Sequence, residues 1–381
     1  MTTGVPISES DLNHHRLQPL LAPRSVAVVG ASERSASFGH IAVSELLDGG
    51  FKGPIYPVNP RYETVSGLKC ANALTELEQV PELVQFCIAN DRLEEQFDQA
   101  IALGIPASVI YGSCYLSSDR PGDTLLVRLT EKARLAGMEV CGGNCMGYRN
   151  LHGNVLAGIY RTSSKELYRG PAALVSHSGT AFSVLTNLDA RVGFELSISA
   201  GQELATTAAD YLDYAIDIPG IRCIAMFLEV IRDPIGFSYA VQRAHDNNQA
   251  VIVLKVGKSE AAARFALSHS GALVGDDAAY DAFFERHGII RVSSLDEMVN
   301  TIQLVAYGKP LGQGALTAAL DSGGKRELLV DTSDEVDVPF ATLSPRTVAT
   351  LAANLDDHLD PVNPLDHWGT GGNDWFERLV N

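Results

Sequence analysis

Residues 26–47 read VAVVGASERSASFGHIAVSELL, and this stretch decides the fold of the first part of the chain. Its first four residues are apolar, and three of them are the β-branched residue valine, which predicts a buried strand. The small residues Gly30, Ala31 and Ser32 then form a turn, and the apolar spacing that follows predicts a helix. The backbone N–H groups of such a turn face the end of a sheet, where they attract phosphate.

This order of strand, turn and helix repeats up to about residue 150. Strands are predicted at 25–30, 54–58, 83–89, 107–112 and 138–142, and helices at 40–50, 93–104 and 125–137. Alternation of this kind indicates a parallel sheet with helices on both faces. We therefore predict an α/β fold whose first domain, residues 16–150, is Rossmann-like.

A second alternating block predicts a flavodoxin-like, doubly wound domain over residues 165–308. Its strands are predicted at 171–176, 195–200, 222–229, 250–256 and 288–292, and its helices at 181–193, 206–217, 234–247, 276–288 and 294–308. A third block, residues 312–381, begins with another strand, turn and helix at 315–335. It ends at DWFERLVN after one unmatched helix, so we expect the chain to be a piece of a longer protein with an incomplete third α/β domain.

Composition excludes several classes of protein. Among 381 residues, Lys+Arg 29 and Asp+Glu 46 give 29 − 46 = −17, a charge that repels nucleic acid and anionic membranes. The sequence has neither a run of roughly 18 apolar residues nor a signal sequence at its start, so we expect a cytoplasmic protein. Its six cysteines are scattered, and neither a disulfide framework nor a metal site is spelled out.

The glycine turn departs from the dinucleotide fingerprint. Ala31 and Ser32 follow Gly30 where that fingerprint has a further glycine, and the second strand ends in Asn59 and Arg61 rather than a carboxylate. Arg61 favours an additional phosphate, such as the 3′-phosphate of coenzyme A. A nicotinamide-dependent oxidoreductase is the disfavoured alternative.

Two polar segments in the second block suggest nucleophilic chemistry. Glu229 ends a predicted parallel strand, where it could hold one nitrogen of His269 and leave the other as a nucleophile. Ser178, Gly179 and Thr180 lie between a strand and a helix, where they form either a phosphate cradle or an ordinary helix cap.

Together, these segments resemble the superfamily of NDP-forming acyl-CoA synthetases, which includes succinyl-CoA synthetase and the ADP-forming acetate–CoA ligases. The resemblance rests on VGAS with YPVNPR, GGNCMGYRN, SHSGT, MFLEVIRD and SHSGALVG, in the family's order, from about residue 20 to the end. It implies a ligase that joins a carboxylic acid to coenzyme A through an acyl phosphate and a phosphohistidine.

The resemblance also implies site residues. His269 is the phosphorylated histidine and Glu229 its supporting carboxylate. Coenzyme A is bound by Gly30, Ala31, Ser32, Asn59, Arg61, Ala89 and Asn90. The acyl and phosphoryl groups are bound by Asn144, Cys145, Gly147, Ser178, Gly179, Thr180, Ser268, Ser270 and Gly271.

Several features depart from the family's pattern or leave alternatives open. Gly143 replaces a usual proline and His177 a usual glutamine or arginine, and Tyr148, Tyr115 and His177 are candidates for lining the pocket. Cys145 is either an acyl-carrying nucleophile or, preferably, a buried thiol. No ATP-grasp segment is present, so ATP or ADP with Mg²⁺ is expected to bind a further domain or subunit, in an oligomer. A non-catalytic CoA-binding regulatory module remains the main alternative function.

Overall fold

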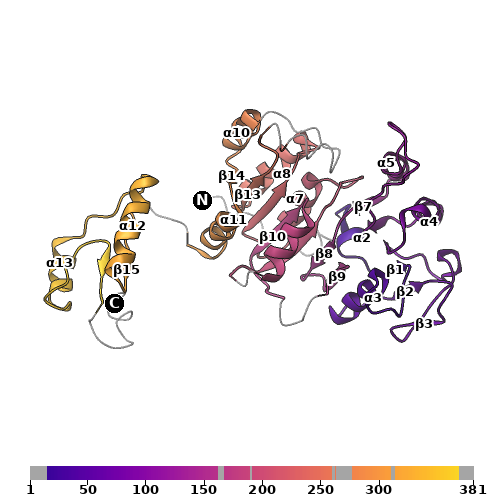
Figure 1. The fold of residues 1–381 in the computed structure, drawn as a ribbon, viewed down its shortest axis with the longest axis horizontal. Helices are drawn as coiled ribbons and strands as arrows, with labels where there is room; N and C mark the ends of the chain where they lie inside the picture. Colours follow the sequence, from indigo (N-terminus) through magenta and orange to yellow (C-terminus); the bar gives the residue numbers. More distant parts are fainter. Residues whose placement is uncertain are drawn as a thin grey trace. The chain divides into compact units, whose positions relative to one another are not determined.

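The structure, a computed structural model, describes residues 15–161, 167–188, 191–259, 262, 277–309 and 314–368. The chain divides into two units, residues 1–308 and 309–381. In Figure 1 the colours run from indigo in the first sheet, through magenta and orange in the second, to yellow in the second unit. Across the described ranges, no helix combines the length and the apolar character needed to cross a membrane.

The first sheet is parallel throughout, in the order β2-β1-β5-β6-β7. Its strands are β1 (Val26–Val29), β2 (Ile55–Val58), β5 (Leu83–Phe86), β6 (Ala107–Ile110) and β7 (Glu139–Gly142), with a small hairpin of β3 (Thr64–Val65) and β4 (Leu68–Lys69). Its helices are α2 (Gln18–Leu21), α3 (Phe38–Asp48), α4 (Asn90–Ala102) and α5 (Leu125–Ala136), with a 3-10 turn η1 (Leu74–Glu76). The predicted Rossmann-like sheet is confirmed.

Local sequence explains where these helices begin and end. The side chain of Ser37 accepts a hydrogen bond from the His40 N–H at the start of α3, and Thr124 does the same for Val127 in α5. Gly137 ends α5 in the left-handed region, at φ 66°. These residues set where α3 begins and where α5 begins and ends.

The second sheet has the order β14-β13-β12-β10-β11-β8-β9. Its parallel strands are β10 (Ala172–Ser176), β11 (Phe194–Ser199), β12 (Cys223–Leu228), β13 (Ala250–Lys255) and β14 (Ile290–Val292). Its helices are α6 (Gly179–Ser183), continued by the π-turn η2 (Val184–Leu188), α7 (Ala208–Ile216), α8 (Pro234–Asp246), α10 (Asp277–Arg286) and α11 (Leu295–Ile302), continued by η3 (Gln303–Tyr307). The parallel strands follow the flavodoxin order, as predicted.

Two antiparallel strands extend this second sheet. They are β8 (Gly147–Asn150) and β9 (Val155–Gly158), and β8 pairs with β11. The sequence analysis predicts no strand in either segment, because each holds only four residues between glycines and turn residues. The pair carries the chain from the first sheet directly into the second.

Each sheet is covered on both faces. In β10, Val175 packs in the cluster that contains α7 and α8, whereas its neighbour Leu174 packs with α6 and α11. The first of these clusters also contains Val28 of β1, so one hydrophobic core is continuous from the first sheet to the second. The two large domains are therefore one packed body.

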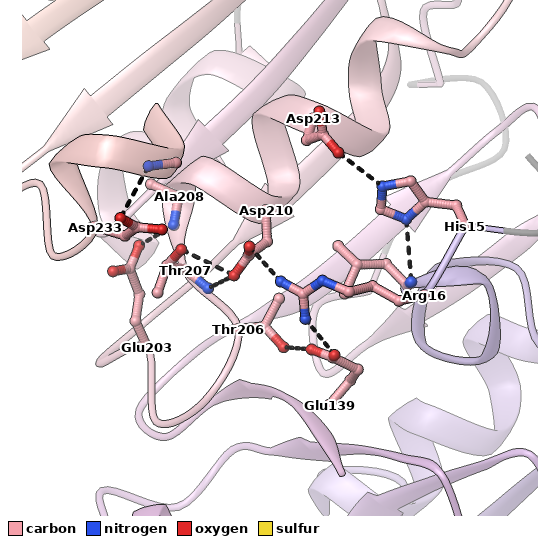
Figure 2. Close-up of polar contacts among 12 residues, drawn as sticks. His15, Arg16, Glu139, Glu203, Thr206, Thr207, Ala208, Asp210, Asp213 and Asp233 are labelled. Carbon is pink, nitrogen blue, oxygen red and sulfur yellow. Dashed lines mark hydrogen bonds and ion pairs between the residues drawn. The ribbon is translucent and has the colours of Figure 1, made fainter. Parts of the chain in front are cut away.

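A polar junction lies beside this shared core (Figure 2). Arg16 forms ion pairs with Glu139 of β7 and with Asp210 of α7, and His15 Nε2 lies 3.2 Å from the Asp213 carboxylate. The segment before α2 thereby links the last strand of the first sheet to a helix of the second domain.

The second unit contains the predicted strand, turn and helix. Its described elements are β15 (Ala319–Leu320), α12 (Gly323–Glu335), α13 (Pro345–Ala352) and β16 (Leu365–Asp366), with β15 and β16 parallel. The DWFERLVN segment lies outside the described residues. The domain bounds 16–150, 165–308 and 312–381 stay predictions.

Candidate active site

A first cavity of about 660 Å³ opens where β1 and β5 end. In the sheet, β2 lies on one side of β1, whereas β5, β6 and β7 lie on the other side. Parallel α/β sheets bind ligands at the point where the strand order reverses in this way. Its walls come from the turn after β1, the loop after β2 and the start of α4. The lining residues are Gly30, Ser32, Arg34, Ser37, Phe38, Gly39, Asn59, Pro60, Arg61, Tyr62, Cys87, Ile88, Ala89 and Arg92.

Two glycines let the backbone close tightly at the turn after β1. Gly30 has φ 89°, and a Cβ atom there would lie 2.4 Å from the Cys87 carbonyl oxygen. A Cβ atom on Gly39 of α3 would lie 1.9 Å from the carbonyl oxygen of Gly30. Asn59 completes the turn, since its Nδ2 donates to the Ala31 carbonyl at 2.7 Å.

Three guanidinium groups make this cavity suitable for phosphate. Arg34, Arg61 and Arg92 line it, and its lining contains no carboxylate. Planar guanidinium groups recognise phosphate oxygens with paired hydrogen bonds. The sequence analysis identifies only Arg61. Arg34 lies in a loop and Arg92 in the first turn of α4, and the sequence does not show that these two segments face the cavity.

Ala31 and Asn90, two of the residues predicted to bind coenzyme A, do not line the cavity. Ala31 is fully buried. Asn90 donates to the Ser113 hydroxyl and to the Tyr115 carbonyl, both at 2.9 Å, and accepts from the Cys114 N–H. Asn90 therefore holds the loop after β6 rather than facing the cavity.

A second cavity of about 670 Å³ opens at the corresponding point of the second sheet, where β10 and β12 end. Phe38, at the start of α3, lines both cavities. The lining residues are Phe38, Tyr111, Asn144, Cys145, Met146, Ile159, Tyr160, His177, Ser178, Gly179, Thr180, Ser183 and Glu229. Six predicted residues thus come together: Asn144, Cys145, Ser178, Gly179, Thr180 and Glu229.

The turn after β10 is built as a capped helix start. The Ser178 hydroxyl accepts from the Ala181 N–H at 3.2 Å, and Ser176 donates its hydroxyl to the Ser178 carbonyl at 2.8 Å. Ser178 therefore caps α6, and with Gly179 and Thr180 it also lines the cavity.

His177 connects this turn to the strand beside it. Its Nδ1 accepts the Glu229 N–H at 3.1 Å, and its Nε2 lies 2.7 Å from Oε1 of Glu203. Because a backbone N–H can only donate, Nδ1 must be the acceptor and Nε2 must carry the proton. The sequence analysis does not identify Glu203, which lies in the loop after β11.

Two family models match the chain. A CoA binding domain matches residues 24–150, and a succinyl-CoA ligase like flavodoxin domain matches residues 169–305. The first range contains every residue that lines the first cavity, and the second range contains six of the thirteen that line the second cavity, from His177 to Glu229. The chain carries a CoA binding domain followed by a succinyl-CoA ligase like flavodoxin domain.

Several curated relatives match nearly the whole chain. A trans-feruloyl-CoA synthase from an unknown prokaryotic organism is 29% identical over 94% of this chain and 52% of its own length. The alpha subunit of an ADP-forming acetate–CoA ligase II from Pyrococcus furiosus is 29% identical over 90% of this chain and 74% of its own. An ADP-forming acetate–CoA ligase from Methanocaldococcus jannaschii is 25% identical over 92% and 49%. The chain spans about half the length of the first and third of these relatives.

A solved structure agrees in fold. The acetyl-coenzyme A synthetase 1 of Ca. Korarchaeum cryptofilum, in complex with phosphate and ADP, superposes with a TM-score of 0.82 at 25% identity. The match covers 94% of this chain and 77% of that one. The fold expected from the superfamily resemblance is therefore the fold observed.

The histidine expected to be phosphorylated falls outside the part of the chain that the structure describes. His269 lies outside the described residues, with Ser268, Ser270 and Gly271. Gly147 begins β8 and does not line the cavity. Of the other candidates for the pocket wall, His177 lines it, Tyr148 is fully buried with its hydroxyl donating to the Leu20 carbonyl, and Tyr115 is exposed and away from it.

Burial shifts the pKa of two further groups, Cys145 in the second cavity and Lys255 at the end of β13. Burial raises the pKa of the Cys145 thiol well above its usual range, which favours the buried thiol over an acyl-carrying nucleophile. Lys255, which the sequence analysis missed at the end of β13, lies 4.5 Å from the centre of the Tyr280 ring. Burial lowers the pKa of Lys255 to about 8, against the opposing effect of the carboxylates of Asp277 and Glu229.

Proposed function

We propose that this chain supplies the coenzyme A and acyl-group sites of an NDP-forming, most simply ADP-forming, acyl-CoA synthetase. The observation that carries the proposal is the pair of cavities that share Phe38 as a lining residue, one lined by three arginines and the other by Glu229 and the turn after β10. The reaction joins a carboxylic acid to coenzyme A while a nucleoside triphosphate becomes the diphosphate and phosphate.

Coenzyme A fits the first cavity by charge and shape. Arg34, Arg61 and Arg92 offset the phosphate groups, and the turn at Gly30 brings backbone N–H groups to the end of the sheet. Because Phe38 lines both cavities, a pantetheine arm that passes this ring delivers its thiol to the second one.

In the second cavity, the proposed relay runs through His269. An imidazole nitrogen of His269 attacks the terminal phosphorus of the nucleotide, and the diphosphate leaves. The substrate carboxylate then attacks that phosphorus, the N–P bond breaks, and an acyl phosphate forms. The sulfur of coenzyme A finally attacks the acyl carbon, and phosphate leaves as the thiol proton passes to a base.

Glu229 and the turn after β10 support these steps. A carboxylate beside the histidine fixes its tautomer and stabilises the positive charge that develops on it. Gly179 and Thr180 face the phosphoryl group at the start of α6, and Asn144 positions the acyl group.

The nucleotide and its Mg²⁺ belong, in this proposal, to an ATP-grasp domain or subunit. Two relatives are alpha subunits by name, and others are about twice as long as this chain. The relatives' names include acetate–CoA, 4-hydroxybutyrate–CoA and trans-feruloyl-CoA enzymes, so these three acyl groups are the first to test.

The test uses the half-reaction that needs no nucleotide. The chain is incubated with phosphate and acetyl-, 4-hydroxybutyryl- or feruloyl-CoA, and phosphohistidine is measured by mass spectrometry at neutral pH. We expect label on His269 with one thioester, none in His269→Ala, and at least about tenfold less in Glu229→Gln. The variant His245→Ala, an exposed histidine of α8, serves as the matched control.

The remaining outcomes separate the alternatives. Calorimetric binding of coenzyme A without label from any thioester contradicts the relay in this chain and favours the CoA-binding regulatory module. Binding of NADH in place of coenzyme A favours the oxidoreductase. Absence of coenzyme A binding overturns the proposal altogether.

A further inference from the structure

We infer that His177 and Glu203 form a buried clamp that positions Glu229, so that His177 is a positioning residue of the second cavity. The inference rests on the proposed function for its catalytic consequence. Its structural part rests on contacts among described residues alone.

The clamp begins where two neighbouring strands end. His177 is the first residue after β10, Glu229 the first after β12, and these strands pair in parallel. The His177 N–H donates to the Phe227 carbonyl at 3.0 Å, and its Nδ1 accepts the Glu229 N–H at 3.1 Å. The imidazole therefore takes the place of a backbone acceptor and extends the pairing of the strands by one residue.

Glu203 holds the imidazole from behind. The side chain of His177 is 4% exposed and that of Glu203 is 0% exposed, and Nε2 lies 2.7 Å from Oε1. A carboxylate buried to this degree must be paired with donors or cations. Glu203 meets that need with His177, with the Ala208 N–H at 2.7 Å (Figure 2), and with Arg232, whose Nε lies 3.5 Å from Oε2.

The two partners hold the loop that carries Glu229 at both ends. His177 binds the N–H of Glu229, at the start of the loop, and Glu203 faces Arg232, near its end. Asp233 then begins α8 by accepting the Gly236 N–H at 2.9 Å (Figure 2). The direction of the Glu229 carboxylate consequently depends on an acceptor at Nδ1 of His177.

Glu203 itself is in an unusual backbone conformation. Its φ of 53° lies in the left-handed region, which residues other than glycine rarely adopt. Such a conformation persists where surrounding contacts require it, and the three contacts of its carboxylate provide that requirement. The clamp is thus built into the loop after β11 as well as into His177.

Three substitutions at His177 test the contributions of its two ring nitrogens separately. His177→Ala removes both hydrogen bonds. His177→Asn keeps an acceptor near the position of Nδ1, toward Glu229, whereas His177→Gln keeps a donor near the position of Nε2, toward Glu203. His245→Ala again controls for loss of a histidine, and thermal melting checks that each variant is folded.

The first measurement is amide hydrogen exchange at Glu229, read by mass spectrometry with residue-level fragmentation. We expect faster exchange in His177→Ala and His177→Gln, and exchange near that of the unmodified chain in His177→Asn. Unchanged exchange in His177→Ala overturns the clamp. So does recovery in the Gln variant without recovery in the Asn variant, because Glu203 would then be the partner that matters.

The second measurement is the rate of phosphohistidine formation from phosphate and the reactive thioester. We expect a fall of about 10- to 100-fold in His177→Ala, partial recovery in His177→Asn, and unchanged binding of coenzyme A by calorimetry. A normal rate in His177→Ala overturns the positioning role while the proposed function stands. Absence of label in the unmodified chain overturns the proposed function, and the exchange measurement still decides the clamp.

Discussion

The three arginines of the first cavity are fixed by their backbones and leave their guanidinium groups to a ligand. The N–H of Arg61 donates to Oδ1 of Asn59, that of Arg34 to the Ser32 hydroxyl, and that of Arg92 to the Ala89 carbonyl. Among the described residues, none of these guanidinium groups pairs with a carboxylate. An anionic ligand therefore meets cations that need not first break an ion pair.

Arg61 should distinguish coenzyme A from its form without the 3′-phosphate. A charge-assisted contact contributes about 1.5–3 kcal/mol, so Arg61→Ala should raise the Kd for coenzyme A by about 10- to 100-fold. The Kd for dephospho-coenzyme A should hardly change. Calorimetry with both ligands checks this, with Arg134→Ala, a surface arginine of α5 paired to Glu131, as control. Equal weakening of both ligands would assign Arg61 to another phosphate.

The sequence predicts those site residues that lie close in the chain to the end of a recognisable strand. Glu229, Asn59 and Gly179 were predicted because each lies within a few residues of a strand end, and the ends of parallel strands converge. Arg92 and Glu203 were missed, because their approach to the cavities depends on how a helix and a loop fold back. His269 stays a prediction.

At the scale of the elements, the start of α3 contributes Phe38 and Gly39 to the wall of the first cavity. The helix starts beside the turn after β1, and Gly39, its second residue, touches the carbonyl oxygen of Gly30. Sequence periodicity predicted α3 and the parallel strands well, since each has a clear apolar pattern. It failed for β8 and β9, whose pairing with β11 depends on contacts distant in the chain.

Replacing Gly39 by alanine should therefore disrupt the turn. A Cβ atom 1.9 Å from backbone oxygen forces α3 away from β1, and overpacking of this kind costs about 1–3 kcal/mol. We expect lower stability in urea unfolding and loss of coenzyme A binding. Gly324→Ala is the matched control, since Gly324 is also the second residue of its helix but has only the Ser322 hydroxyl oxygen nearby, at 3.9 Å. Equal effects in both variants would contradict the steric explanation.

At the scale of the whole molecule, the proposed function requires the two cavities of the first unit to keep their relative position across the shared core. Phe38 belongs to the first domain and yet lines the second cavity. The hydrophobic cluster common to both sheets supplies the bulk of that coupling. The polar junction at Arg16 adds an ion-pair link between the two domains, because its two carboxylate partners lie in different domains (Figure 2).

Arg16→Gln should loosen this junction without unfolding either domain. The Arg16 side chain is 52% exposed, so the loss should be no more than about 1 kcal/mol of unfolding free energy, and it should shrink in 1 M salt. Coenzyme A binding, which needs the first domain alone, should persist, whereas phosphohistidine formation from a CoA thioester should slow, because the thiol must reach the second cavity. Urea unfolding and the labelling assay measure the two effects.

Arg24→Gln is the control for this prediction, because it breaks a pair with Glu82 within the first domain and should leave labelling unchanged. If both variants label alike, Arg16 does not couple the domains and the shared core alone sets the distance between the cavities.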